Sequence, residues 1–272
     1  MKRYRHYKRD KAIVLSCFGS VIEQDKYLEL ESDVKKRFPE VDVFMAFSSR
    51  MVLKMLKKEG REFKNLAQTL ADVDMLGYKN IIVASVNLFP TDEHELTKKI
   101  SDGFDSFSLA NIRVTDAVLT KTKETTLFLK ELDKSIKKDG TANLYVIHGT
   151  PRLDIRGIDS ITYTHNFLES FEGNFCCSLE GSYPWYAYKD AVINKIIKDG
   201  YKKVQVIPML LVSGNHYIKD MVEIKDELSE FFESSIVESL TKDEKFNLLE
   251  LPTVREIIYK NIEEEIIKLG CK

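Results

Sequence analysis

Three side chains that could carry chemistry each follow an apolar run of this chain: His148, Glu180 and His216. Two imidazoles and one carboxylate suit a borderline divalent metal such as Co²⁺, Fe²⁺, Ni²⁺ or Zn²⁺. The same groups suit proton transfer near neutral pH, because histidine titrates there. They are far apart in the sequence, unlike the HExxH pattern, in which both ligands share one helix face. Only the fold can bring them together, so the site prediction depends on the fold prediction.

Each of these residues also has an ordinary structural interpretation. A single histidine after a strand is more often a hydrogen-bonding loop residue than a ligand. An acid such as Glu180 at the start of a helix is stabilised by the helix dipole without any ligand. His6 and His165 are interpreted as surface residues, the second on a predicted helix. His94, next to Glu93, is interpreted as a surface residue as well, with a supporting place beside a metal ligand as the alternative.

The elements that must position the three residues are indicated by apolar runs and amphipathic segments. Short continuous apolar runs suit strands that are buried on both faces. Strands are predicted at 12–17, 41–47, 80–88, 112–117, 143–147, 175–179, 204–212 and 236–238. Helices are predicted at 23–37, 49–59, 66–76, 93–102, 124–137, 161–169, 188–198, 218–232 and 254–269. This alternation of strands and helices predicts an α/β protein with parallel sheets.

An internal repeat divides the chain into similar halves. The segment LGYKNIIVASVNLFPTDEHELTKKI and the segment DGYKKVQVIPMLLVSGNHYIKDMVE align without a gap, which sets Glu93 on the position of His216. One supersecondary unit is therefore used twice. We predict two Rossmann-like halves, 1–127 and 128–272, each a parallel sheet flanked by helices, with a cleft between them. The last helix is expected to pack back on the first half.

The predicted site belongs to the second half. Ligands of open α/β sheets bind beyond the carboxyl ends of the strands. His148, Glu180 and His216 each follow a predicted strand of residues 128–272. We therefore expect the metal or acid–base site at that edge.

Composition and motifs exclude several classes of protein. The net charge of −2 over 272 residues gives no bulk attraction to nucleic acid or to a membrane surface. The sequence contains no GxGxxG, P-loop or GxSxG motif. The cysteines show no CxxC spacing, which favours a reduced, cytoplasmic chain. The start, MKRYRHYKRDKAIVLSCFGSV, is interpreted as a basic tail before a strand and not as an export signal.

Five stretches, taken in order, resemble one enzyme family: KAIVLSCFGS, FMAFSSRMVLKML, HGT, LEGSYP and IPMLLVSGNHYIKDM. They are similar to the cobalt chelatases of the anaerobic cobalamin pathway, which are class II chelatases with ferrochelatase as distant kin. The resemblance covers nearly the whole chain. It implies a bilobal fold and the insertion of Co²⁺ into sirohydrochlorin, a tetrapyrrole.

The resemblance also implies roles for particular residues. The family's two metal-binding histidines and its glutamate match His148, His216 and Glu180, and its first-half acid matches Glu93. The divalent ion is then a substrate, and no permanent organic cofactor is expected. A carboxylate-rich ring needs cations at the rim of the site. Arg50 and Arg152 lie beside the corner motifs, although an ordinary exposed arginine fits these positions equally well.

One departure from the family pattern leaves the metal open. Asn215 stands where the family has an aspartate next to the histidine, so a charge beside His216 is absent. The alternatives are a chelatase for Fe²⁺ or Ni²⁺ with a related ring and a non-catalytic tetrapyrrole or metal carrier. A periplasmic metal-binding protein is a third alternative. Homo-oligomerisation is also left open.

Overall fold

The computed structural model describes residues 6–214, 217–241 and 245–270. The strands are β1 (Arg9–Cys17), β2 (Asp42–Phe47), β3 (Tyr78–Val86), β4 (Asn111–Val114), β5 (Thr141–Gly149), β6 (Asn174–Glu180), β7 (Lys203–Met209) and β8 (Glu233–Ile236). The helices are α1 (Gln24–Arg37), α2 (Arg50–Lys58), α3 (Leu66–Met75), α4 (Asp92–Phe107), α5 (Thr122–Ile136), α6 (Gly157–Glu169), α7 (Trp185–Lys198), α8 (Val222–Leu228) and α9 (Pro252–Gly270). A π-helical turn, η2 (Tyr217–Met221), precedes α8, and a 3-10 turn, η3 (Leu248–Glu250), precedes α9.

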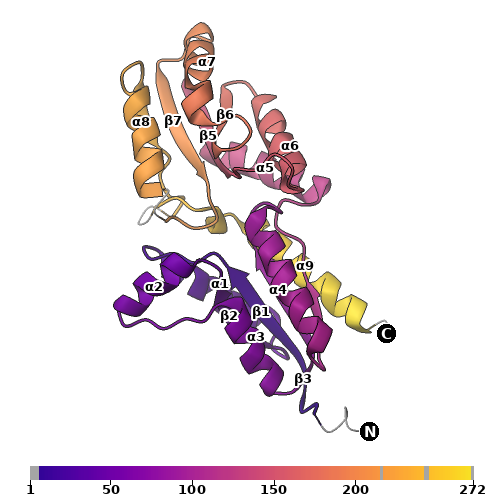
Figure 1. Ribbon diagram of the computed structural model, residues 1–272. Helices are drawn as coiled ribbons and strands as arrows, with labels where there is room; N and C mark the ends of the chain where they lie inside the picture. The colour runs from indigo at the N-terminus through magenta and orange to yellow at the C-terminus, as the bar shows by residue number, and fades with distance from the viewer. Residues whose placement is uncertain (1–5, 215–216, 242–244, 271–272) are drawn as a thin grey trace. The chain divides into compact units, whose positions relative to one another are not determined.

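These strands form two parallel sheets with the same topology (Figure 1). The first has the order β2-β1-β3-β4, and the second has the order β6-β5-β7-β8. The predicted α/β fold class with two similar halves is confirmed. Contacts divide the chain into a first unit, Met1–Val118 with Arg255–Lys272, and a second unit, Leu119–Val254. The predicted boundary at 127/128 lies within helix α5, which belongs to the second unit.

Helices cover both faces of each sheet, which explains the continuous apolar runs of the central strands. In the first unit, α3 and α4 pack on the face that carries Ala12 and Val14. Arg113 on the other face pairs with α9. In the second unit, α7 and α8 pack on the face that carries Leu144 and Val146, while α5 and α6 contact the opposite face.

The repeat aligns β3 with β7, and these strands occupy the same place in the two sheets. The predicted strand 204–212 was too long, because β7 ends at Met209. Leu211 and Val212 are buried, but their segment pairs with η3: the amide nitrogens of Leu248 and Leu249 donate to the carbonyl oxygens of Leu210 and Leu211. Burial within a sheet and burial against a 3-10 turn both require apolar residues, so the apolar run did not mark the end of β7.

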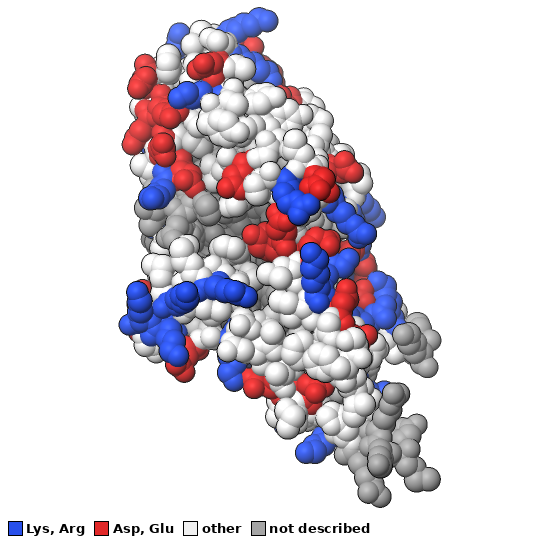
Figure 2. Space-filling model, in the orientation of Figure 1, with Lys and Arg blue, Asp and Glu red and all other residues white. Residues whose placement is uncertain are grey.

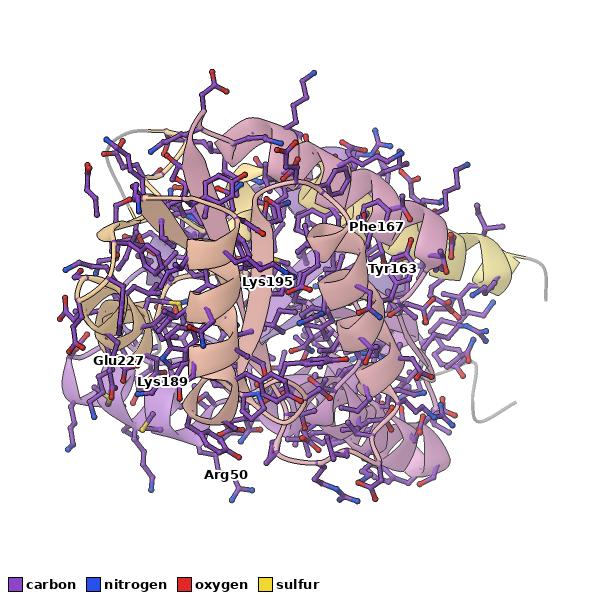
Figure 3. All side chains as sticks on the ribbon, turned by 90° about the horizontal axis from the view of Figure 1, so that it is seen from above. Arg50, Tyr163, Phe167, Lys189, Lys195 and Glu227 are labelled. Atoms are coloured by element: carbon purple, nitrogen blue, oxygen red, sulfur yellow. The ribbon has the colours of Figure 1, made fainter. Side chains whose placement is uncertain are left out.

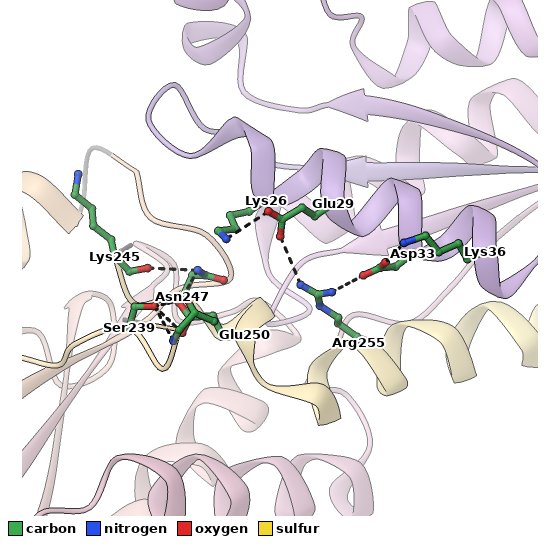
Figure 4. Close-up of polar contacts among 10 residues, drawn as sticks. Lys26, Glu29, Asp33, Lys36, Ser239, Lys245, Asn247, Glu250 and Arg255 are labelled. Carbon is green, nitrogen blue, oxygen red and sulfur yellow. Dashed lines mark hydrogen bonds and ion pairs between the residues drawn. The ribbon is translucent and has the colours of Figure 1, made fainter. Parts of the chain in front are cut away.

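Helix α9 begins in the second unit at Pro252 and continues into the first. Ion pairs join it to the first unit (Figure 4): Arg255 pairs with Asp33 and with Glu29, the latter at 3.9 Å. Arg37 Nη2 lies 2.7 Å from Glu263 Oε1. Ile257, Ile258 and Ile262 of α9 are buried, whereas Ile267 near its end is exposed. The closing helix is thus part of the first unit's core.

Amide side chains form a buried ladder across the second sheet, at the amino ends of its strands. Asn143 Nδ2 donates to Asn174 Oδ1 at 2.9 Å, and Gln205 Nε2 donates to Asn143 Oδ1 at 2.7 Å. Asn174 Nδ2 and the Tyr145 hydroxyl both donate to Asp133 Oδ1, at 2.6 Å and 3.2 Å. The ladder fixes the register of β6, β5 and β7, because a one-residue slip would leave these groups unpaired.

Asn143→Leu is expected to lower the free energy of unfolding of the second unit by about 2 kcal/mol, because Asn174 Oδ1 and one Gln205 N–H lose their partner in the core. Urea unfolding followed by the fluorescence of Trp185, the chain's only tryptophan, measures this loss. The variant should retain function, since His148 lies at the other end of β5. An unchanged unfolding midpoint would contradict the assigned role of the ladder.

Candidate functional site

His148 and Glu180 lie at the carboxyl ends of adjacent parallel strands, β5 and β6. His148 is half-buried, and its Nδ1 lies 3.3 Å from the Gly149 carbonyl oxygen. The Glu180 side chain is exposed. The structure therefore brings two of the three predicted residues to one edge of one sheet, where a ligand of an open α/β sheet is expected.

The register defines how the two side chains can meet. Glu180 lies opposite Gly149, so His148 is opposite Leu179. Because side chains alternate between the faces of a pleated strand, His148 and Glu180 start from opposite faces. They can converge only beyond the edge of the sheet.

Glycines lock the two corners together. Gly149 has a φ of +80°, and a Cβ on it would lie 2.0 Å from the Glu180 carbonyl oxygen. Gly181 has a φ of +78°, and a Cβ on it would lie 2.1 Å from the Thr150 carbonyl oxygen. Neither position can accept a side chain without movement of the neighbouring backbone. The backbones that carry His148 and Glu180 are therefore held in fixed, close contact.

His216 and Asn215 lie outside the described residues. Among residues 6–214, 217–241 and 245–270, no group of three or more His, Cys, Asp or Glu side chains is arranged to hold a metal ion. The convergence of all three ligands therefore stays a prediction. The π-helical turn η2 begins directly after His216, and such turns often occur at functional sites.

The repeat shows what the first unit has at the corresponding positions. On the central strand of the first sheet, Cys17 lies opposite Val86 of β3 and Phe47 of β2. On the central strand of the second sheet, Ile147 lies opposite Met209 of β7 and Ser178 of β6 in the same way. Phe18 thus corresponds to His148, Ser49 to Glu180 and Glu93 to His216. Of these three counterparts only Glu93 is a metal-binding type of residue. The fold is duplicated, whereas the predicted ligand set lies in the second unit only.

Glu93 lies in the first turn of α4, where the helix dipole favours an acid. Its side chain is half-buried, and the Thr91 hydroxyl is 3.5 Å from its Oε2. The carboxylate is therefore placed at the carboxyl-end edge of the first sheet. A supporting or substrate-contacting role for Glu93 stays a prediction.

The surface interpretation of His94 was wrong, because its side chain is only 6% exposed. Its Nδ1 lies 2.8 Å from the Ser85 hydroxyl on β3, and Thr97, one turn on, lies 3.1 Å from the hydroxyl of Ser16. Helix α4 thus buries a polar face against serines of the sheet. The sequence signal was present as Ser16 and Ser85 inside otherwise apolar strands.

Burial lowers the pKa of His94 below its ordinary value of 6.5, and the nearby Lys98 adds to the effect. The folded protein therefore favours the neutral imidazole. The stability that this group contributes is complete above pH 6.5 and is lost as the pH falls. Thermal midpoints from circular dichroism should fall less between pH 7 and pH 5 in His94→Asn than in the unmodified chain. Equal pH dependence in both would contradict this.

His165 was also wrongly assigned to the surface. It is 8% exposed, and its ring stacks on Tyr183 with centroids 4.0 Å apart. Tyr183 follows Glu180 in the corner after β6. Sequence reasoning missed the contact because it joins α6 to a corner beyond the next strand, with no periodic pattern linking the two. Burial lowers the pKa of this histidine too.

The two predicted substrate-binding arginines differ in their surroundings. Arg152 is exposed and makes a bidentate pair with Asp154, at 3.0 Å and 2.8 Å, so a substrate carboxylate would compete with that aspartate. Arg50 begins α2, whose exposed cations Arg50, Lys54, Lys57 and Lys58 give the basic surface seen over this helix in Figure 2. Arg50 therefore lies among exposed cations, whereas the Arg152 guanidinium is paired with Asp154.

The two-sheet fold is shared with solved chelatases. SirB from Bacillus subtilis with Fe³⁺ has a TM-score of 0.65 and 15% identity over 94% of this chain and 95% of that one. SirB from Bacillus subtilis subspecies spizizenii in complex with cobalt has a TM-score of 0.61 and 14% identity, covering 94% of each chain. The fold is therefore that of the sirohydrochlorin chelatases.

The sequence comparisons define the family. The sirohydrochlorin cobaltochelatase of Salmonella typhimurium is 21% identical over 226 residues, which are 78% of this chain and 80% of that protein. The family model described as cobalt chelatase (CbiK) matches residues 11–266. The chain belongs to the cobalt chelatase (CbiK) family, which confirms the resemblance found in its motifs. In the described part of the chain, no helix has the length and apolar character needed to cross a bilayer.

Proposed function

We propose that this protein is a sirohydrochlorin cobaltochelatase, which inserts Co²⁺ into sirohydrochlorin. The observation that carries the proposal is the family match across residues 11–266. The position of His148 and Glu180 at one edge of the second sheet supports it. The free thiols of Cys17, Cys176 and Cys177 support a cytoplasmic location as part of the same proposal.

The proposed metal ligands are His148, Glu180 and His216. They hold the incoming Co²⁺ while leaving coordination positions open, since a closed cage would not release the ion. The ring nitrogens replace these ligands one after another. Two pyrrole N–H protons must leave as the metal enters, and the side chains of His148 and Glu180 are proposed to accept them once they release the ion.

The proposed substrate contacts come from Arg50, Arg152 and Glu93. Sirohydrochlorin carries many carboxylates, which a guanidinium can bind in bidentate geometry. Arg152 already holds Asp154 in that geometry, so it would exchange one carboxylate for another. Glu93, the first-unit counterpart of His216 in the repeat, is proposed to support the metal ligands or to contact the tetrapyrrole.

Anaerobic incubation with sirohydrochlorin and Co²⁺ tests the function. The absorbance change of the metallated ring should proceed over many turnovers per protein molecule. Parallel reactions with Fe²⁺ and Ni²⁺ rank the metals, and faster insertion of either would replace Co²⁺ in the proposal. Stoichiometric binding of the ring without turnover would instead indicate a carrier.

A further inference from the structure

The corner that follows β6 contains a tyrosine in a strained backbone conformation. Tyr183 has a φ of +60°, and within the described ranges it is the only residue other than glycine with a positive φ. Few side chains adopt this region, so the surrounding contacts must hold the tyrosine there. Backbone strain of this kind is often found at functional sites, and Glu180 lies three residues before Tyr183 in the same corner.

The corner closes on β6 through its backbone. The Ser178 amide donates to the Tyr183 carbonyl oxygen at 3.0 Å, and the Ser178 hydroxyl donates to the Ser182 carbonyl oxygen. Ser178 also forms a β-bridge with Pro184. Glu180 lies inside this closed loop, two residues after Ser178. Its backbone can therefore move only if the loop opens.

Aromatic rings hold the strained residue in place. The His165 ring stacks on the Tyr183 ring with centroids 4.0 Å apart and an interplanar angle of 19°. The Tyr188 ring meets the Tyr183 ring edge-on, with centroids 5.5 Å apart. Tyr183 therefore lies between α6 and α7. Loss of the His165 ring would remove the face-on contact and leave the strain of Tyr183 less well compensated.

Helix α6 itself is tied to the outer edge of β6. Glu169, one turn after His165, accepts the Cys176 amide at Oε1, 3.2 Å away, and pairs with Lys195 of α7 at 3.0 Å. Lys195 is labelled in Figure 3. The two outward amides of β6 at Cys176 and Ser178 are thus bound by the Glu169 side chain and by the corner. This support gives the His165 ring a fixed position against Tyr183.

We propose that His165 is a positioning residue for Glu180. It holds the corner at Tyr183 closed, so that the exposed Glu180 carboxylate is presented from a fixed backbone at the edge of the sheet. A ligand that is already ordered binds a metal ion more tightly, because less conformational freedom is lost on binding. The inference rests on the proposed role of Glu180 as a metal ligand.

Calorimetric measurement of the affinity for Co²⁺, without any tetrapyrrole present, tests the inference. His165→Ala should raise the Kd for Co²⁺ about tenfold, the lower end of the effect of residues that support metal ligands. His165→Phe retains a flat ring and should stay within about twofold of the unmodified chain. In the Glu180→Gln background, His165→Ala should have no further effect, since the ligand that it positions has been replaced.

A neighbouring aromatic residue provides the matched control. Phe167, also on α6, stacks with Tyr163 at 5.8 Å; both residues are labelled in Figure 3. Phe167 also meets Phe171 edge-on at 5.3 Å. Phe167→Ala removes a ring of the same helix and should leave the Kd for Co²⁺ unchanged. Equal loss in Phe167→Ala and His165→Ala, or equal loss in His165→Phe and His165→Ala, would overturn the inference.

Hydrogen exchange separates this inference from the proposed function. The Ser178 amide is bound by the corner, so it should exchange faster in His165→Ala and at the original rate in His165→Phe. Unchanged protection of Ser178 in His165→Ala would overturn the inference whatever happens to Co²⁺. If the corner opens as expected but Glu180→Gln binds Co²⁺ as the unmodified chain does, the proposed ligand role of Glu180 fails, and the positioning role with it.

Discussion

His148→Ala should lower the rate of Co²⁺ insertion into sirohydrochlorin at least about a hundredfold. Loss of a residue that merely supports a ligand often costs 10–100-fold, and the loss of a ligand should cost more. His148 is also a proposed proton acceptor, so the variant loses two functions at once. The rate is measured from the absorbance of the metallated ring under anaerobic conditions.

Two controls make the result specific to the imidazole. The urea midpoint reported by Trp185 should stay close to that of the unmodified chain, because the His148 side chain is only half-buried. Added imidazole should restore part of the rate by occupying the space that the variant leaves. His216→Ala is expected to behave similarly. Near-normal rates in both histidine variants would refute the ligand assignment.

Gly149→Ala is expected to have the largest effect on stability. The new Cβ would lie 2.0 Å from the Glu180 carbonyl oxygen, and the residue would also have to keep a φ of +80°. We expect the free energy of unfolding of the second unit to fall by more than about 3 kcal/mol, as for other changes that force backbone movement in a packed region. Metal insertion should fall too, because the displaced backbone carries Glu180.

Gly200 offers a matched control for this variant. It lies in the same unit with a φ of +84°, but a Cβ on it would meet nothing within 4 Å. Gly200→Ala therefore carries only the cost of the left-handed conformation, about 1 kcal/mol. Urea unfolding monitored at Trp185 compares the two. Equal losses would show that the close approach of the corners has no energetic importance.

The sequence predicted the architecture because the fold repeats a strongly patterned unit. The gap-free alignment of the segments at Leu76 and Asp199 anticipated that β3 and β7 would occupy equivalent places. The apolar runs identified the central strands, which are buried on both faces. Strand ends were less predictable, as at Leu211 and Val212, because burial against a loop and burial in a sheet require the same residue types.

The site was predicted only in part. The carboxyl ends of parallel strands lie at one edge, so the proximity of the corners at His148 and Glu180 followed from topology. The close approach of the backbones at Gly149 and Gly181 could not be predicted from the sequence, because glycine occurs in turns of many kinds. The burial of His94 and His165 was missed, since their partners Ser85 and Tyr183 are set by tertiary packing.

The path of α9 bears on how the chain acquires its structure during synthesis. Residues Arg255 onward complete the first unit, yet a ribosome makes them only after the whole second unit. Domains usually fold in the order of translation. Here all residues of the second unit, Leu119–Val254, are synthesised before the first unit has the buried Ile262 and the ion-paired Arg255 of α9. The unit whose strands are translated first is thus the unit that is completed last.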